Sequence, residues 1–243
     1  YFSATKLEWL LAKHARADVG ELAAGTVDSW LIWQLTGGAV HATDPTNASR
    51  TMLYDIEARA WSPWLCELFG ISPALLPEVR PSSGSFGVAS AEHFGRELPI
   101  LGVAGDQQAA LYGQACVREG QAKNTYGTGA FLLCHTGDVR PRQGQGMLAT
   151  VACGPRGEAA YALEASIFIA GAAVLWLRDG LGVLTKASDT DALARSLASN
   201  EGVYFVPALT GLGAPHWEPA ARGMIVGLTR GTGRAHLARA ALE

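Results

Sequence analysis

Residues 99–111 read PILGVAGDQQAAL, and this stretch decides the fold class. The apolar run from Pro99 to Ala104 predicts a buried strand, and residues Gln107 to Cys116 predict a helix directly after it. The strand ends at Gly105-Asp106. Because ligands in open α/β sheets bind beyond the carboxyl ends of the strands, Asp106 stands where a site is expected.

Asp106 supports two interpretations from these residues alone. Its carboxylate can accept a proton from an alcohol that attacks a phosphoryl group, while Gln107 holds a second hydroxyl by hydrogen bonding. It can equally cap the helix that follows, which is a common role for aspartate. On this segment the two interpretations are even.

Helices and strands alternate along the rest of the chain, which predicts the α/β class. The periodicity predicts helices at residues 3–15, 26–35, 63–69, 164–179 and 189–198 and from 234 onward, and strands at 122–126, 130–134, 147–153, 159–163 and 203–207. Residues 44–49 have the composition of a polar turn. We place a domain boundary near residues 116–121, where a helix gives way to strands.

Composition limits the kind of partner. The chain has 243 residues, of which 49% are hydrophobic and 17% charged, and its net charge is −3. This charge gives no basic footprint for nucleic acid, and no apolar run approaches the ~20 residues of a membrane span. The four cysteines have no metal-type spacing, so we expect free thiols in a reducing cytoplasm. The six histidines show no metal-ligand pattern either.

Two glycine-containing segments are weaker candidates for a nucleotide site. Residues 124–129 read NTYGTG, where glycines permit a tight turn and Thr128 offers a hydroxyl to phosphate oxygens. An ordinary hairpin turn is the simpler explanation of that run taken alone. Gly171 falls inside a predicted apolar helix, where close helix packing is a simpler explanation than close approach of a nucleotide. The loop at residues 209–215 either lines a cleft or only connects, and Trp217 beside it is expected in the core.

In order along the chain, several segments resemble the FGGY family of carbohydrate kinases, and within it the branch that phosphorylates glycerol. The resemblance covers residues 1–243, and its strongest parts are YFS with TK at 1–6, GTVD at 25–28, TNASRTML at 46–53, GDQQAAL at 105–111 and KNTYGTG at 123–129. Residues 223–243 also resemble a family signature. One such segment would be weak, whereas the ordered set is specific.

The resemblance implies an actin/hexokinase-like (ribonuclease H-like) fold of two domains, with residues 1–116 from the first, substrate-side domain and 117–243 from the second, nucleotide-side domain. It implies ATP-dependent phosphorylation of glycerol to glycerol 3-phosphate, with Mg²⁺. Asp106 is then the catalytic base and a substrate contact, Gln107 and Tyr1 contact the same substrate, and Thr128 and Gly171 line the ATP site. Which residues would hold the metal stays unknown.

The chain also departs from the family pattern. Leu175 stands where the family commonly has a glutamine, and no sugar-bisphosphate loop is evident at residues 91–98. The chain opens without methionine and stops within a helical pattern, so we expect an internal fragment, incomplete at both ends and with little or no activity alone. The alternatives are a kinase for another polyol or ketose, an inert binding module, and an actin-like ATPase. The oligomeric state stays open, with a homo-oligomer of the full-length protein as one alternative.

Overall fold

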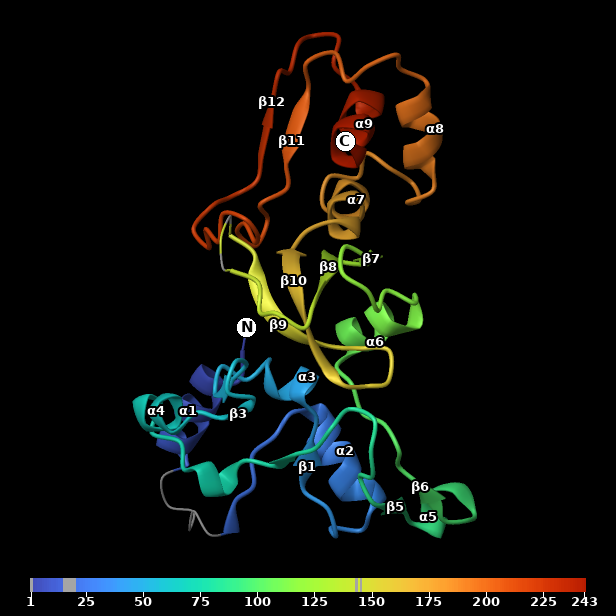
Figure 1. The fold of residues 1–243 in the computed structure, drawn as a ribbon. Helices are drawn as coiled ribbons and strands as arrows, with labels where there is room; N and C mark the ends of the chain where they lie inside the picture. The colour runs from blue at the N-terminus through green and yellow to red at the C-terminus, as the bar shows by residue number, and fades with distance from the viewer. Residues whose placement is uncertain (1, 15–20, 143, 145) are drawn as a thin grey trace. The chain divides into compact units, whose positions relative to one another are not determined.

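A computed structural model describes residues 2–14, 21–142, 144 and 146–243 of the chain. These residues form two compact units. Unit 1 comprises residues 1–123, 133–142 and 149–163, and unit 2 comprises residues 124–132, 143–148 and 164–243. Each unit is described by itself below, and Figure 1 gives the labels of the helices and strands.

The first part of unit 1 consists of short helices and two-stranded pairs. Its elements are α1 (Ala4–Lys13), α2 (Val27–Leu35), β1 (Ala42–Thr43), α3 (Pro45–Ala48), β2 (Tyr54–Asp55), β3 (Ala60–Trp61), α4 (Pro63–Leu68), the 3₁₀ helix η2 (Pro73–Leu75), β4 (Glu78–Val79), β5 (Val88–Ala89), α5 (Ala91–Phe94), β6 (Leu98–Pro99) and α6 (Asp106–Gly113). Strand β1 pairs with β4 in parallel, and the pairs β2–β3 and β5–β6 are antiparallel.

The longest strands form one four-stranded sheet. They are β7 (Ala122–Tyr126), β8 (Ala130–Gly137), β9 (Leu148–Cys153) and β10 (Ala159–Ile167), and their order in the sheet is β7-β8-β10-β9. Helix α6 packs on the part of these strands that belongs to unit 1, through a cluster of buried residues: Leu111, Cys116, Leu133, Ala152 and Ala162. This packing fixes the helix that Asp106 opens.

Unit 2 carries the remaining helices and a hairpin-like pair of strands. Its elements are α7 (Gly171–Asp179), α8 (Asp189–Arg195), β11 (Tyr204–Val206), β12 (Met224–Val226) and α9 (Arg234–Leu242), and β11 and β12 pair antiparallel. Helix α9 lies between α8 and β11 (Figure 1). In unit 2, the buried residues Leu177, Leu184 and Ala238 form a hydrophobic core cluster.

The predicted strand from Pro99 to Ala104 is wrong in extent. Only Leu98–Pro99 is a strand, and Leu101 is 62% exposed. The segment is extended and bonds to residues 82–87, for example from the Phe86 N–H to the Ile100 carbonyl at 2.8 Å. Within the part of the chain that the structure describes, residues 98–104 have a bonded neighbour along one edge only, which is the segment at residues 82–89. A strand inside a sheet has neighbours along both edges, so residues 99–104 are not an interior strand.

Two other expectations need correction. The predicted helix from Glu164 starts only at Gly171, because residues Glu164–Ile167 continue strand β10. The predicted turn at residues 44–49 contains the short helix α3 instead. Both misreadings arise where a polar or apolar run has no clear period, and the partner that decides the outcome is distant in sequence.

The four cysteines are free thiols, as expected. Among the described residues, no helix is long and apolar enough to cross a membrane.

Candidate active site

Asp106 is the first residue of α6, and Gly105 is its N-cap. The Asp106 side chain is exposed, and among the described residues its one hydrogen-bond partner is the Gln107 amide, whose Nε2 donates to Oδ2 at 3.1 Å. The carboxylate therefore does not bond to the backbone N–H groups of the first turn, as a capping aspartate would. It is left accessible at the positive end of the helix.

A buried aspartate fixes the backbone just before this position. Asp44 is fully buried at the N-cap of α3, and its carboxylate accepts five hydrogen bonds. Their donors are the Thr46 N–H and hydroxyl (3.1 and 2.7 Å), the Asn47 N–H and Nδ2 (3.0 and 2.8 Å) and the Ser82 hydroxyl (2.6 Å). Such a set of donors compensates the burial of a charge.

Thr46 connects the buried Asp44 carboxylate to the backbone of Gly105. The Thr46 hydroxyl donates to Asp44 and accepts from the Gly105 N–H at 2.8 Å, across 59 positions of sequence. A Cβ on Gly105 would lie 2.8 Å from Oε1 of Gln108, a side chain that is itself buried and bonds to Thr150 at 3.2 Å. A residue with a Cβ at position 105 would therefore displace the buried Gln108 side chain.

Gln107 links Asp106 to a second buried ion. Its Oε1 accepts a hydrogen bond from Nζ of Lys123 on β7, and Lys123 is only 7% exposed. No role of Lys123, Asp44 or Thr46 was predicted from the sequence. An Asp-Pro pair at residues 44–45 is an N-cap signal that predicts the local helix, but nothing local indicates its contact with Gly105.

A cavity of about 520 Å³ adjoins the segment that leads into α6. Its lining includes Ser82, Ala104, Tyr112 and Cys153, whereas Asp106 and Gln107 do not line it. Burial raises the pKa of the Cys153 thiol, a hydrogen bond with Ser82 opposes the shift, and the nearby charge of Asp44 adds to it. A neutral thiol there is a packing group rather than a nucleophile.

In unit 2 the NTYGTG turn is held by the start of α7. The Thr128 carbonyl accepts from the N–H groups of Ala170 and Ala172 at 2.8 and 3.1 Å, and the Gly127 carbonyl accepts from the Gly171 N–H at 3.0 Å. Both carbonyls therefore satisfy N–H groups that a helix start leaves without intrahelical partners. The Thr128 residue itself is exposed.

Gly171 lies at the beginning of α7, not inside a helix as predicted. A Cβ there would lie 2.6 Å from the Gly127 carbonyl oxygen, and one on Gly129 would lie 2.4 Å from that of Ile167. Because these two glycines have no Cβ, the turn at residues 127–129 can pack closely against the backbone of α7 and β10. The explanation by close packing thus holds for Gly171, although its partner is a turn rather than another helix.

A second cavity, which we call the unit 2 cavity, opens beside these glycines. Its volume is about 560 Å³, and its lining is Tyr126, Gly127, Ala170, Gly171, Val174, Phe205, Pro207 and residues 240–243. Gly171 therefore reaches the cavity, while Thr128 holds its wall through the backbone. Leu175 is 40% exposed and does not belong to the lining.

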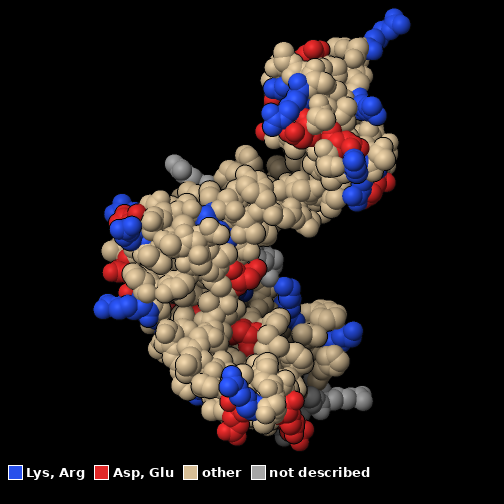
Figure 2. Space-filling model, turned by 90° about the vertical axis from the view of Figure 1, so that its right-hand side faces the viewer, with Lys and Arg blue, Asp and Glu red and all other residues tan. Residues whose placement is uncertain are grey.

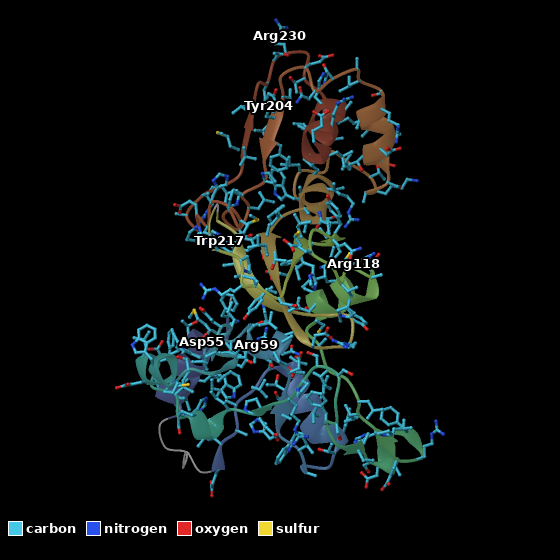
Figure 3. All side chains as sticks on the ribbon, viewed as in Figure 1. Asp55, Arg59, Arg118, Tyr204, Trp217 and Arg230 are labelled. Carbon is cyan, nitrogen blue, oxygen red and sulfur yellow. The ribbon has the colours of Figure 1, made fainter. Side chains whose placement is uncertain are left out.

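The loop at residues 209–215 connects and packs. Ala214 donates its N–H to the Ser166 carbonyl at 2.9 Å, and a Cβ on Gly213 would lie 2.1 Å from that oxygen. Trp217 (Figure 3) packs edge-on against Phe168 with the ring centres 6.1 Å apart and donates Nε1–H to the Gly146 carbonyl. The predicted packing role of Trp217 agrees with these contacts.

Tyr1, the remaining predicted substrate contact, lies outside the described residues. Within them, the structure brings Asp106 and Gln107 together in unit 1 and Gly171 and the Thr128 turn together in unit 2. On the face in Figure 2, basic and acidic side chains are interspersed rather than gathered by sign.

Comparison with known proteins gives the family. Residues 1–113 match the N-terminal domain of the FGGY family of carbohydrate kinases, and residues 122–243 match its C-terminal domain. The curated relatives include glycerol kinases of Polaromonas naphthalenivorans (56% identical) and Thermus brockianus (59% identical), each aligned over 247 positions. Each alignment covers all of this chain and 50% of the relative, so the chain spans about half the length of the curated relatives it matches.

Solved structures agree with this assignment. A Plasmodium falciparum glycerol kinase crystallised with ADP is 39% identical, with a TM-score of 0.86 over 99% of this chain and 49% of that one. A xylulose kinase from Brucella ovis is 25% identical, with a TM-score of 0.84 over the same shares. The predicted α/β, actin/hexokinase-like fold is confirmed by these structural relatives. The chain belongs to the FGGY family of carbohydrate kinases.

Proposed function

We propose that the protein containing this chain transfers the terminal phosphoryl group of ATP to glycerol and forms glycerol 3-phosphate. The observation that carries the proposal is the placement of Asp106: an exposed carboxylate at a helix start, on backbone pinned by a buried network and beside a side-chain amide. Relatives named glycerol kinase, 54–59% identical over the whole chain, support glycerol as the alcohol.

In this proposal Asp106 accepts the proton of the attacking hydroxyl, which is general-base catalysis. Gln107 holds another hydroxyl of the same substrate, and Tyr1 packs against it. Together these three residues would hold a bound alcohol in a defined orientation. Positioning of the reactants supplies a large part of the rate enhancement in phosphoryl transfer.

The unit 2 cavity is our proposed site for ATP. Its volume of about 560 Å³ and its wall of glycines at residues 127 and 171 suit a ligand that approaches backbone closely. The apolar side chains of Val174, Phe205 and Pro207 suit a planar base. Thr128 contributes the turn and its exposed hydroxyl. In the ADP-bound Plasmodium relative a nucleotide accompanies this same fold.

Mg²⁺ belongs to the proposal as the ion that neutralises charge on the phosphates of ATP. In the described part of the chain, no three His, Cys, Asp or Glu residues are grouped to hold a metal ion. In kinase sites Mg²⁺ is commonly carried largely by nucleotide phosphates and water. We assign it no protein ligand.

Three broader expectations remain part of the proposal. Residues 1–116 belong to a substrate-side domain and residues 117–243 to a nucleotide-side domain. The protein acts in the cytoplasm, which the free thiols support. Glycerol is its small-molecule partner, and a homo-oligomer of the full-length protein is one possible assembly.

A panel of alcohols tests the function directly. The longest natural chain containing these residues is assayed with ATP, Mg²⁺ and glycerol, other polyols or ketoses, with release of ADP as the readout. Glycerol should give the highest kcat/KM. A kinase for another sugar, which the Brucella ovis likeness keeps as the second candidate, would instead show ketose turnover well above glycerol turnover.

The 243-residue chain is assayed in parallel. We expect little or no turnover from it, because it spans about half the length of its relatives. Turnover at the rate of the longer protein would contradict that expectation and would exclude an inert binding module.

A further inference from the structure

Lys123 is an ion in an unusual place. It lies on β7 with 7% of its surface exposed, and lysine is rarely this buried unless its ammonium is paired. Its ammonium donates to Oε1 of Gln107, a residue 16 positions earlier that directly follows Asp106. The contact joins the start of β7 to the first turn of α6, and both Lys123 and Gln107 lie in unit 1.

The lysine determines how the Gln107 amide is oriented. An ammonium group has only donors, so it selects the carbonyl oxygen of the amide and turns the NH₂ group the other way. Nε2 then donates to Oδ2 of Asp106 at 3.1 Å. With the opposite orientation of the amide, an NH₂ group would face the ammonium and a carbonyl would face the carboxylate, and both contacts would be repulsive.

We propose that Lys123 is a positioning residue for phosphoryl transfer: it fixes the Gln107 amide so that the amide holds Asp106 and donates to the substrate. This inference rests on the proposed function. Lys123 itself touches neither reactant in the proposal and acts through Gln107.

The fixed amide also constrains the substrate. One N–H of Nε2 goes to Asp106, and the carbonyl is engaged by Lys123, so the other N–H is what Gln107 offers to a ligand. A substrate atom that contacts this N–H must therefore be a hydrogen-bond acceptor. A hydroxyl oxygen meets this requirement, whereas an ammonium group in its place does not.

A double-mutant cycle in the active full-length protein tests the proposal. The variants are Lys123→Met, Gln107→Leu, their combination, and Lys123→Arg, which keeps the charge and the donors. Lys186→Met, at an exposed lysine of unit 2, is the matched control for the same change of side chain. For each protein, kcat, the KM for glycerol, the KM for ATP and the melting temperature are measured.

We expect Lys123→Met to lower kcat/KM for glycerol by about 10- to 100-fold, the range for loss of a charged hydrogen bond that positions a reacting group. The KM for ATP should stay unchanged, and Lys123→Arg should recover part of the loss. In the Gln107→Leu background the same change should cost less than about twofold, since the amide it orients is gone.

The opposite results overturn the inference. A purely structural lysine would lower the melting temperature and would cost the same with and without Gln107. Wild-type kinetics in Lys123→Met would also refute it. If the wild-type protein phosphorylates no polyol, both the proposed function and this inference are refuted. If the wild-type protein is active but the effects of Lys123→Met and Gln107→Leu simply add, only the role of Lys123 is refuted.

Discussion

The candidate site of unit 1 is formed mainly by side chains, whereas that of unit 2 is formed mainly by backbone. In unit 1 the site consists of side chains: a carboxylate, an amide and a buried ammonium, on backbone fixed by the five hydrogen bonds of Asp44. In unit 2 it consists of backbone, where glycines let the turn at residues 127–129 meet α7 and β10.

Because of this difference, we expect the two regions to tolerate different substitutions. A site of side chains is damaged by changes that keep shape and alter charge or donors. A site of backbone is damaged by a single added methyl group and is indifferent to most polar changes nearby. The predictions below test this contrast, beginning with the largest effect.

Asp106→Asn should be the most damaging change to activity. Because the amide keeps the shape but cannot take the proton, kcat should fall by about 10²–10⁴-fold or more. The thermal stability should be unchanged, since the side chain is exposed. Steady-state kinetics with ATP and glycerol measure the effect, with exposed Asp138→Asn as the control. Loss of less than tenfold would remove Asp106 as the base.

Asp44→Ala should be the most damaging change to stability in unit 1. It leaves buried donors of Thr46, Asn47 and Ser82 without their acceptor, which should cost about 3 kcal/mol of unfolding free energy. Denaturant unfolding measures it, and catalysis should fall too as Gly105 loses its anchor.

Asp55→Ala is the matched control for this change. Asp55 (Figure 3) also accepts two backbone N–H groups, from Glu57 and Ala58, but at the surface. The N–H groups of Ala58 and Glu57 hold the pKa of its carboxyl below the ordinary value. Removing it should cost less than about 1 kcal/mol, because water replaces the lost acceptor. Equal costs for the two variants would contradict the importance we give to burial.

Gly171→Ala tests the backbone-built region. Its new methyl would lie 2.6 Å from the Gly127 carbonyl, and the forced shift should cost about 1–3 kcal/mol. The KM for ATP should rise while the KM for glycerol stays unchanged. Gly233→Ala is the control, as a Cβ there meets nothing within 4 Å. A rise in the KM for glycerol instead would break the division between the two regions.

Tyr54→Phe should have the smallest effect, visible only at high pH. Burial, the largest cause, raises the pKa of Tyr54 from 10.0 to about 12, with Arg59 opposing it and Asp44 adding to it. The fold therefore favours the neutral phenol, and this stability is fully present below pH 10 and lost as pH rises toward 12. Thermal melts of the wild type should fall more steeply over that window than those of the variant. Parallel curves would show that Tyr54 does not contribute.

The sequence predicted the parts of the fold that are encoded locally. The helix at residues 27–35 and the strands at 122–126 and 148–153 lie within a residue or so of the prediction, because glycines in the sequence mark their ends. The segment after Glu164 was misread, because a strand rich in alanine has no period that separates it from a helix. Only pairing with distant strands decides it.

The candidate site divides in the same way. Asp106 and Gln107 could be proposed from the sequence because they adjoin each other where an apolar run gives way to a helix. The roles of Asp44 and Lys123 were missed, since each acts on a residue that is distant along the chain. The capping interpretation of Asp106 does not hold in the structure, because Gly105 occupies the N-cap, while the role of Asp106 as the base stays a prediction.

The bond from Gly105 to Thr46 has a consequence for how the protein is made. During synthesis the carboxylate of Asp44 emerges well before its last donor, Ser82, which follows 38 residues later, and the hydroxyl of Thr46 emerges 59 residues before its donor Gly105. Closing loops of that length is slow compared with forming a local turn. The geometry around Asp106 therefore forms late, once residue 105 has been made, and a nascent chain paused before residue 82 leaves the Asp44 carboxylate without one of its five hydrogen-bond donors.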